Sequence, residues 1–167
     1  CGYDTWVGVR ESTSRRYLDD PRLKFIVLDY GDADAESAVV LQAMPGQKRW
    51  DYIVWNLGAT KCADANDFER INYGYLRTFA TVITALGKQP ERFLYMSSLS
   101  VLGPGDEKGY TPFSSASVPH PDTAYGRSKL KSELYLERYS ALPWIIFRPT
   151  GIYGPHEKDY LMMIESI

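Results

Sequence analysis

Residues 92–98 read RFLYMSS and residues 123–133 read TAYGRSKLKSE, and these two stretches decide the predicted fold. The first is a short apolar and aromatic run that ends in two serines, which is typical of a buried β-strand. The second opens a helix that we expect to run from about Thr123 to Tyr139. A buried strand followed by a helix is the repeating unit of an α/β sheet.

The same alternation continues along the chain. A long helix is expected from about Ala65 to Leu86, because apolar residues recur there at steps of three and four, and Gly87 is suited to end it. The apolar runs are continuous, as in strands whose sheet carries helices on both faces. The predicted strands are Thr5–Val9, Lys24–Leu28, Tyr52–Asn56, Arg92–Ser97 and Trp144–Phe147.

Three further segments complete the expected organisation. Residues 103–122 form a long polar loop rich in proline and glycine, and loops of this length inside a domain are usually functional. Residues 1–4 look like the close of a helix that leads into a strand. Residues 160–167 look like the start of a new apolar helix.

Composition and charge exclude several classes of protein. The 167 residues are 44% hydrophobic, carry a formal net charge of -2 and show no basic stripe, which argues against a nucleic-acid partner. No apolar run approaches the ~20 residues of a membrane-spanning helix. Cys1 and Cys62 are too few for a disulfide scaffold or a zinc site. We therefore expect a soluble, cytoplasmic protein without a membrane partner or a metal site.

A tyrosine and a lysine carry the candidate chemistry. Tyr125 and Lys129 are four residues apart on the predicted helix, so they lie about one turn (~5.4 Å) apart on one face. A neighbouring ammonium stabilises a phenolate, which makes the phenol a usable acid or base. Taken alone, such a pair also fits an ordinary solvated helix, and serines at a strand end fit an ordinary turn.

Five stretches, in order, resemble the extended short-chain dehydrogenase/reductases, the NAD-dependent epimerase/dehydratase family. The strand end FLYMSSLSVLG (93–103) with the following Tyr125/Lys129 helix is one, and IIFRPTGIYGP (145–155) nearly copies the family signature RPxxVYGP. The others are FIVLDYGDAD (25–34), DYIVWNLGATK (51–61) and RINYGYLRTF (70–79). The resemblance extends from about Thr5 to Tyr160.

This resemblance implies a fold, a cofactor and catalytic roles. The implied fold is the doubly wound parallel sheet of the NAD(P)-binding Rossmann type, with NAD or NADP as cofactor. Tyr125 would move a proton, Lys129 would assist it and orient the cofactor ribose, and Ser98 would hydrogen-bond the substrate oxygen. Asn72 would help to hold Lys129 through a water molecule.

The resemblance also implies a set of cofactor contacts. Asp29 and Tyr30 would contact the adenine, and Pro149 would lie against the nicotinamide. Ser97, Tyr125 and Lys129 would face the cofactor as well. Small residues allow close approach of a backbone to a ligand, and the turn with that role here would be Leu57, Gly58 and Ala59.

The chain departs from the family at both ends. The glycine-rich TGxxGxxG loop, which would hold the pyrophosphate at a helix N-terminus, is absent from the sequence. We therefore expect residues 1–167 to form one partial Rossmann domain that lacks the first strand and most of the C-terminal substrate-binding lobe. Because that strand lies in the middle of the sheet, we expect a gap or an exposed edge, self-association, and poor NAD(P) binding without catalysis by this chain alone.

The choice of cofactor depends on one arginine. In VGVRESTSRR (7–16), Arg10 stands where this family distinguishes a ribose hydroxyl from a 2′-phosphate, which favours NADP. The negative charge of Glu11 is unfavourable for a phosphate. A polar loop with some positive charge and no role in cofactor binding is the alternative interpretation.

The sequence leaves alternatives for the substrate and for the type of reaction. The family's larger membership favours a nucleotide-sugar substrate and a homodimer formed through the two long helices. Because Leu99 follows Ser98 and no acid appears before Asp106, an epimerase or a carbonyl reductase is favoured over a dehydratase. A non-catalytic NADP-sensing or scaffolding relative is the alternative, and a pure interaction module is a third possibility.

Overall fold

The computed structural model describes residues 2–106, 108–155 and 159–166. The strands in these residues are β1 (Trp6–Val9), β2 (Lys24–Val27), β3 (Tyr52–Trp55), β4 (Arg92–Met96) and β5 (Trp144–Phe147). Each predicted strand is present, with bounds that differ by at most one residue from the expected ones. All observed pairings are parallel, which confirms the α/β class.

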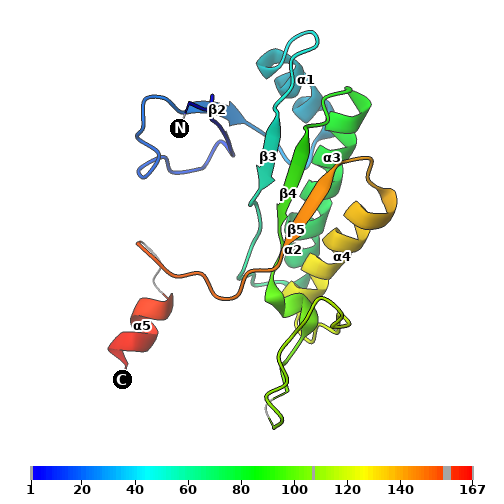
Figure 1. The fold of residues 1–167 in the computed structure, drawn as a ribbon. Helices are drawn as coiled ribbons and strands as arrows, with labels where there is room; N and C mark the ends of the chain where they lie inside the picture. Colours follow the sequence, from blue (N-terminus) through cyan, green and yellow to red (C-terminus); the bar gives the residue numbers. More distant parts are fainter. Residues whose placement is uncertain (1, 107, 156–158, 167) are drawn as a thin grey trace.

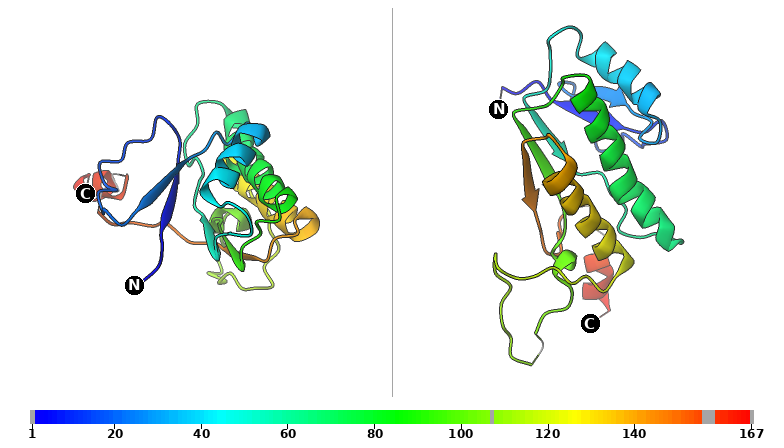
Figure 2. Two further views of the ribbon diagram at one scale, coloured as in Figure 1. Left: turned by 90° about the horizontal axis from the view of Figure 1, so that it is seen from above. Right: turned by 90° about the vertical axis from the view of Figure 1, so that its right-hand side faces the viewer.

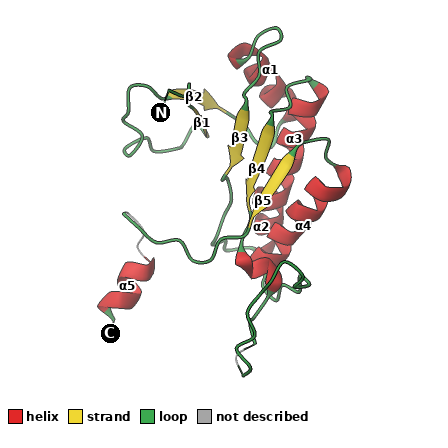
Figure 3. Cartoon of the chain, viewed as in Figure 1, coloured by secondary structure: helices red, strands yellow, loops and turns green. Residues whose placement is uncertain are grey.

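The strands form two separate sheets (Figure 1; strands in yellow in Figure 3). In one sheet β1 pairs with β2, and in the other the order is β3-β4-β5. The register of the larger sheet pairs Trp55 with Tyr95 and Tyr95 with Ile146. This arrangement brings the carboxyl ends of β3, β4 and β5 to the same edge of the sheet.

The helices are α1 (Ala33–Ala43), α2 (Ala65–Phe68), α3 (Tyr75–Ala85), α4 (Ala124–Tyr139) and α5 (Asp159–Glu165). A π-helical segment η1 (Glu69–Gly74) joins α2 to α3, and a 3-10 helix η2 (Leu99–Leu102) follows β4. The predicted helix from Ala65 to Leu86 therefore has the expected extent but contains a π turn. Gly87 ends it with φ of 65°, a conformation that glycine adopts without strain.

The start of α4 has a local cause in the sequence. The Thr123 hydroxyl accepts a hydrogen bond of 3.0 Å from the main-chain nitrogen of Gly126, a normal N-cap contact. Pro121 and Asp122 lie outside the helix, as expected. The capping threonine thus determines where the helix that carries Tyr125 and Lys129 begins.

Helices cover one face of the larger sheet, as the views in Figures 1 and 2 show for α3 and α4. On the other face Val54 is 60% exposed and Tyr52 is 54% exposed, and Phe147 is also exposed. The expectation of helices on both faces is therefore wrong for the part of the chain that the structure describes. The continuous apolar runs of β3 and β5 leave apolar side chains on the open face.

The chain ends and the helix α1 differ in part from the expectations. Residues 2–4 are not helical, so the expected close of a helix is wrong there, and Cys1 lies outside the described residues. Helix α5 begins at Asp159, which agrees with an apolar helix near the C-terminus. The sequence did not predict α1, whose short side chains form no clear apolar stripe; Asp32 caps it by accepting bonds from Asp34 and Ala35.

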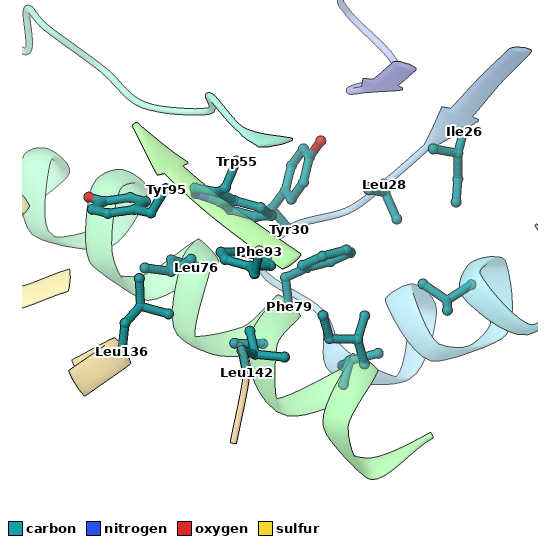
Figure 4. Close-up of a cluster of buried hydrophobic side chains, with 14 residues drawn as sticks. Ile26, Leu28, Tyr30, Trp55, Leu76, Phe79, Phe93, Tyr95, Leu136 and Leu142 are labelled. Atoms are coloured by element: carbon teal, nitrogen blue, oxygen red, sulfur yellow. The ribbon is translucent and has the colours of Figure 1, made fainter. Parts of the chain in front are cut away.

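The core joins the two sheets through aromatic side chains (Figure 4). Tyr30, after β2, packs edge-on against Trp55 of β3 at 5.7 Å between ring centroids and stacks with Tyr75 of α3 at 5.8 Å. Trp55 in turn contacts Phe79 and Phe93. Side-chain packing therefore connects β2 with β3, where no strand pairing is present in the described residues.

Candidate active site

A pocket of about 660 Å³ lies where the carboxyl ends of β3, β4 and β5 meet the start of α4. Ligands of open parallel sheets bind at this edge. The lining residues come from the last residue of β4, from the segment after each strand, from the 103–122 loop and from α4. They are Asn56, Gly58, Thr60, Met96, Ser97, Ser98, Leu99, Ser100, Gly103, Gly105, Phe113, Tyr125, Lys129, Pro149, Thr150, Gly151 and Ile152.

Tyr125 and Lys129 both line this pocket from α4. The Lys129 nitrogen lies 5.9 Å from the centroid of the Tyr125 ring and 5.1 Å from that of Tyr95. It donates a hydrogen bond of 2.8 Å to the main-chain oxygen of Met96. Burial lowers the pKa of Lys129 to about 8, while the negative charge of Glu133 acts in the opposite direction. The ring of Tyr125 also contacts Phe68 edge-on at 6.0 Å.

The two serines after β4 have different surroundings. Ser98 caps η2 by accepting a bond of 3.1 Å from the main-chain nitrogen of Ser100, and it lines the same pocket as Tyr125. Ser97 is buried, and its hydroxyl donates to the Glu133 carboxylate. Of the two hydroxyls, that of Ser98 is therefore the better placed to meet a substrate.

Asn72 connects the turn after β3 with the helix α4. Its side-chain oxygen accepts a bond of 2.7 Å from the nitrogen of Ala59, and its side-chain nitrogen donates to the Ala59 oxygen and the Ser128 hydroxyl. The π turn η1 presents this fully buried residue to both partners. Asn72 thus holds the turn that carries Gly58, and it reaches α4 at Ser128, the neighbour of Lys129.

The turn after β3 approaches Lys129 closely at Gly58. A β-carbon on Gly58 would lie 3.1 Å from the Lys129 nitrogen and 3.0 Å from the Asn72 side-chain oxygen. A larger residue would have to displace one of them, so glycine is favoured at this position. Leu57 is half-buried and packs against the core.

The expected adenine-side residues lie together in a second pocket of about 550 Å³ at the ends of β1 and β2. Arg10, Asp29 and Tyr30 line it. Burial, reinforced by the negative charge of Glu36, raises the pKa of Tyr30 to about 12. The expected site residues thus fall into two groups, one at each pocket, with Leu57, Ala59 and Asn72 supporting the first.

Sequence reasoning missed several residues of this region. Glu133, Arg148 and Ser128 were not singled out, nor was Phe113, which lines the pocket from the long loop. Glu133 had a detectable signal, because it continues the four-residue spacing of Tyr125 and Lys129 along α4. The position of Phe113 depends on the path of a long loop, which local sequence patterns do not determine.

In residues 2–106, 108–155 and 159–166, no group of three or more His, Cys, Asp and Glu side chains is arranged to hold a metal ion. None of the helices formed by those residues is both long enough and apolar enough to span a bilayer.

Parallel sheets with a pocket at their carboxyl ends are the arrangement found in nucleotide-binding α/β proteins. Comparison with known families is more specific. The chain belongs to the NAD dependent epimerase/dehydratase family, which matches residues 1–167. The resemblance found in the sequence is thereby confirmed.

Individual relatives agree with this assignment. A UDP-glucose 4-epimerase from Vibrio cholerae is 35% identical over 77 residues, which are 44% of this chain and 23% of that protein. A putative epimerase from Burkholderia cenocepacia J2315 has 25% identity and a TM-score of 0.74, over 99% of this chain and 52% of that one. A dTDP-glucose 4,6-dehydratase from Streptomyces venezuelae, solved with NAD, has 25% identity and a TM-score of 0.66, over 83% and 41%.

The relatives also differ from the chain in length and among themselves in cofactor. The chain spans about half the length of the solved structures that it matches, or somewhat less. Related structures contain NAD or NADPH. These proteins share the Rossmann-type parallel sheet with the present chain.

Proposed function

We propose that the chain forms the cofactor-binding core of an NAD(P)-dependent enzyme that acts on nucleotide-sugars, either an epimerase or a related carbonyl reductase. The observation that carries this proposal is the shared pocket of Ser98, Tyr125 and Lys129 at the carboxyl ends of the strands. Membership of the epimerase/dehydratase family supports it.

The residues of both pockets fit a dinucleotide. Gly58 provides the close approach beside Lys129 that a bound ribose needs, and Pro149 borders the same pocket. Asp29 and Arg10 lie in the second pocket, where they would meet the adenosine end. When bound, the nicotinamide would accept a hydride from a sugar carbon or return it.

The residues of the chain would have separate tasks in this reaction. The Tyr125 hydroxyl would take the proton of the substrate hydroxyl, or return it, as a general base or acid. Ser98 would hydrogen-bond the same substrate oxygen and hold it beside Tyr125. The positive charge of Lys129 would favour a developing phenolate, and the same ammonium would hold the ribose.

The lining of the pocket supports an epimerase or reductase over a dehydratase. A dehydratase of this family usually needs an acid near the active-site hydroxyl, and no Asp or Glu is among the described lining residues. Asp106, the first acid after Ser98 in the sequence, instead accepts bonds from Gly109 and Thr111 within the long loop.

We also propose that this chain binds the cofactor poorly when it is separated from the rest of such an enzyme. The support is the separation of β1-β2 from β3-β4-β5 and the absence of a TGxxGxxG loop from the sequence. A further strand with its glycine-rich loop would join the two sheets and supply donors for the pyrophosphate. Calorimetry with NADP tests this point, and micromolar binding by residues 1–167 alone would contradict it.

The function is tested with the complete protein that contains this chain. UDP-glucose and dTDP-glucose are supplied with NAD or NADP, and products are separated by chromatography. Tyr125→Phe is expected to lower turnover by at least about two orders of magnitude, the usual effect of a lost acid or base, with little change in cofactor affinity. Tyr139→Phe, an exposed tyrosine on the same helix, is the control.

Two outcomes would contradict the proposal. If Tyr125→Phe keeps near wild-type turnover, another group moves the proton. If the complete protein binds NADP but converts no nucleotide-sugar or simple carbonyl substrate, a sensing or scaffolding role replaces the catalytic one.

A further inference from the structure

A buried carboxylate joins three elements behind the candidate active site. Glu133 of α4 is 1% exposed, and its carboxylate accepts the hydroxyl hydrogen of Ser97, which follows β4. It also forms an ion pair with Arg148, which follows β5, at 2.6 Å between Nη2 and Oε2. The guanidinium Nε adds a bond of 3.1 Å to Oε1. The Glu133 side chain thus links α4 to the segments that follow β4 and β5.

Each partner of Glu133 is the neighbour of a residue that lines the pocket. Ser97 precedes Ser98, Arg148 precedes Pro149, and Glu133 lies one turn after Lys129. The two strand ends are also joined by main-chain bonds, from Ser97 N to Phe147 O at 2.8 Å and from Leu99 N to Pro149 O at 2.9 Å. A displacement of the Glu133 carboxylate would therefore change the positions of Ser98, Pro149 and Lys129 together.

The charges around this carboxylate come from three elements. Lys129 and Glu137 are on α4, and Arg148 follows β5. The negative charge of Glu137 also acts on the Arg148 guanidinium. Tyr95 of β4 has the Lys129 ammonium over its ring, at 5.1 Å to the centroid. The negative charge of Glu133 also acts on the Tyr95 hydroxyl. The ring of Tyr125 also lies near the Lys129 ammonium, at 5.9 Å to its centroid. Glu133 is the fully buried anion among them, so its charge is the least screened by solvent.

We propose that Glu133 is a positioning residue that fixes the Ser97–Ser98 strand end and sets the electrostatic environment of Lys129. It does not line the pocket and acts through Ser97, Arg148 and Lys129. Its effect on turnover rests on the proposed function, whereas its effect on the charge of Lys129 does not.

The first experiment measures the ionisation of Lys129 directly. In the complete protein, isotope-labelled lysine side chains are titrated by NMR, and the Lys129 signal is assigned by its loss in Lys129→Met. Because the negative charge of Glu133 raises the pKa of Lys129 against the effect of burial, Glu133→Gln should lower the titration midpoint by about one pH unit. Glu137→Gln, the same change one turn later on the exposed face of α4, should leave it unchanged. An unchanged midpoint in Glu133→Gln would overturn the proposal.

The second experiment separates positioning from stability. Replacing a buried ion pair by apolar residues often preserves or increases stability. The double variant Glu133→Met with Arg148→Met should therefore melt near the wild-type temperature and still lose at least about tenfold in kcat, the scale of a misplaced reacting group. Wild-type kcat in the folded double variant would reduce Glu133 to a structural role and overturn the proposal. If the wild-type protein turns over no substrate, the proposed function is contradicted instead. The titration of Lys129 then tests the proposed role of Glu133 by itself.

Discussion

The Lys129 ammonium donates a 2.8 Å hydrogen bond to the main-chain oxygen of Met96, the last residue of β4. This bond ties the middle of α4 to the carboxyl end of the central strand of the larger sheet. An ammonium has three donor hydrogens, so the same group can hold a strand end and face a ligand. The position of the lysine is therefore determined by the sheet as well as by its own helix.

The burial of Lys129 predicts a specific pH dependence of stability. Its pKa falls from an ordinary value of 10.5 to about 8 in the folded protein. At a pH between these two pKa values, Lys129 is protonated in the unfolded chain and has lost its proton in the folded chain. The contribution of Lys129 to the free energy of unfolding therefore rises with pH across this window, by up to about 3 kcal/mol.

Chemical denaturation of wild type and Lys129→Met, at pH values on both sides of the window, measures this contribution. The stability of the wild type relative to the variant should increase with pH. Other buried groups also titrate, including Glu36, whose pKa burial raises to about 8. They do so in both proteins and cancel in the difference. A difference that stays constant with pH would show that Lys129 is not desolvated.

Gly126→Ala should disturb the site next to Tyr125. A β-carbon on Gly126 would lie 2.5 Å from the main-chain oxygen of Ser100, so α4 and η2 would have to separate. We expect the free energy of unfolding to fall by about 1–3 kcal/mol, as for an overpacked core position. Turnover should fall as well, because Tyr125 belongs to α4 and Ser98 caps η2, the two elements that separate.

Gly74→Ala is the matched control for Gly126→Ala, measured by thermal unfolding and steady-state kinetics. Its β-carbon would have the Glu69 oxygen as nearest neighbour at 3.8 Å, an ordinary contact. Alanine is the better helix former, so this change should be neutral or stabilise by up to about 1 kcal/mol. Equal effects of the two substitutions would rule out the contact between Gly126 and Ser100 as the cause.

Arg10→Asp tests the preference for NADP. Arg10 is exposed, lines the second pocket after β1 and lies near enough to Tyr30 for its charge to act there. In the complete protein this change should weaken NADP binding more than NAD binding, because only NADP carries the 2′-phosphate. Isothermal calorimetry with both cofactors measures the two affinities. Arg22→Asp, an exposed arginine of the same connection that pairs with Asp20, should affect neither, and an equal loss for both cofactors in Arg10→Asp would contradict a phosphate site.

Local sequence signals predicted the strands well. All five strands lie within one residue of their expected bounds, because apolar runs of this length between turn residues have few alternatives in a globular chain. The two long helices were also predicted, the first from the apolar period before Gly87 and the second as a segment from about Thr123 to Tyr139. Helix α1 was missed, since its short side chains bury little area and give no strong period.

The π turn η1 and the contacts of Asn72 were beyond local patterns. Apolar periodicity indicated a helix but did not distinguish a π turn from regular α turns, so residues 65–86 were predicted as one regular helix. The partners of Asn72, at Ala59 and Ser128, are 13 and 56 residues away in the chain. Such contacts form only when the turn after β3 and α4 pack against the same segment.

The sequence by itself determined the order of strands and helices, the family, and the four-residue spacing that places Tyr125, Lys129 and Glu133 along one helix. These properties follow from apolar period, capping and motif order, which are local. Only the tertiary structure decided that the Ser97 hydroxyl donates to Glu133, that Ser98 and Tyr125 line one pocket, and that Arg148 completes the buried carboxylate network. The physical reason is that a buried charge must find its partners in space, and these partners come from strands that are far apart in the chain.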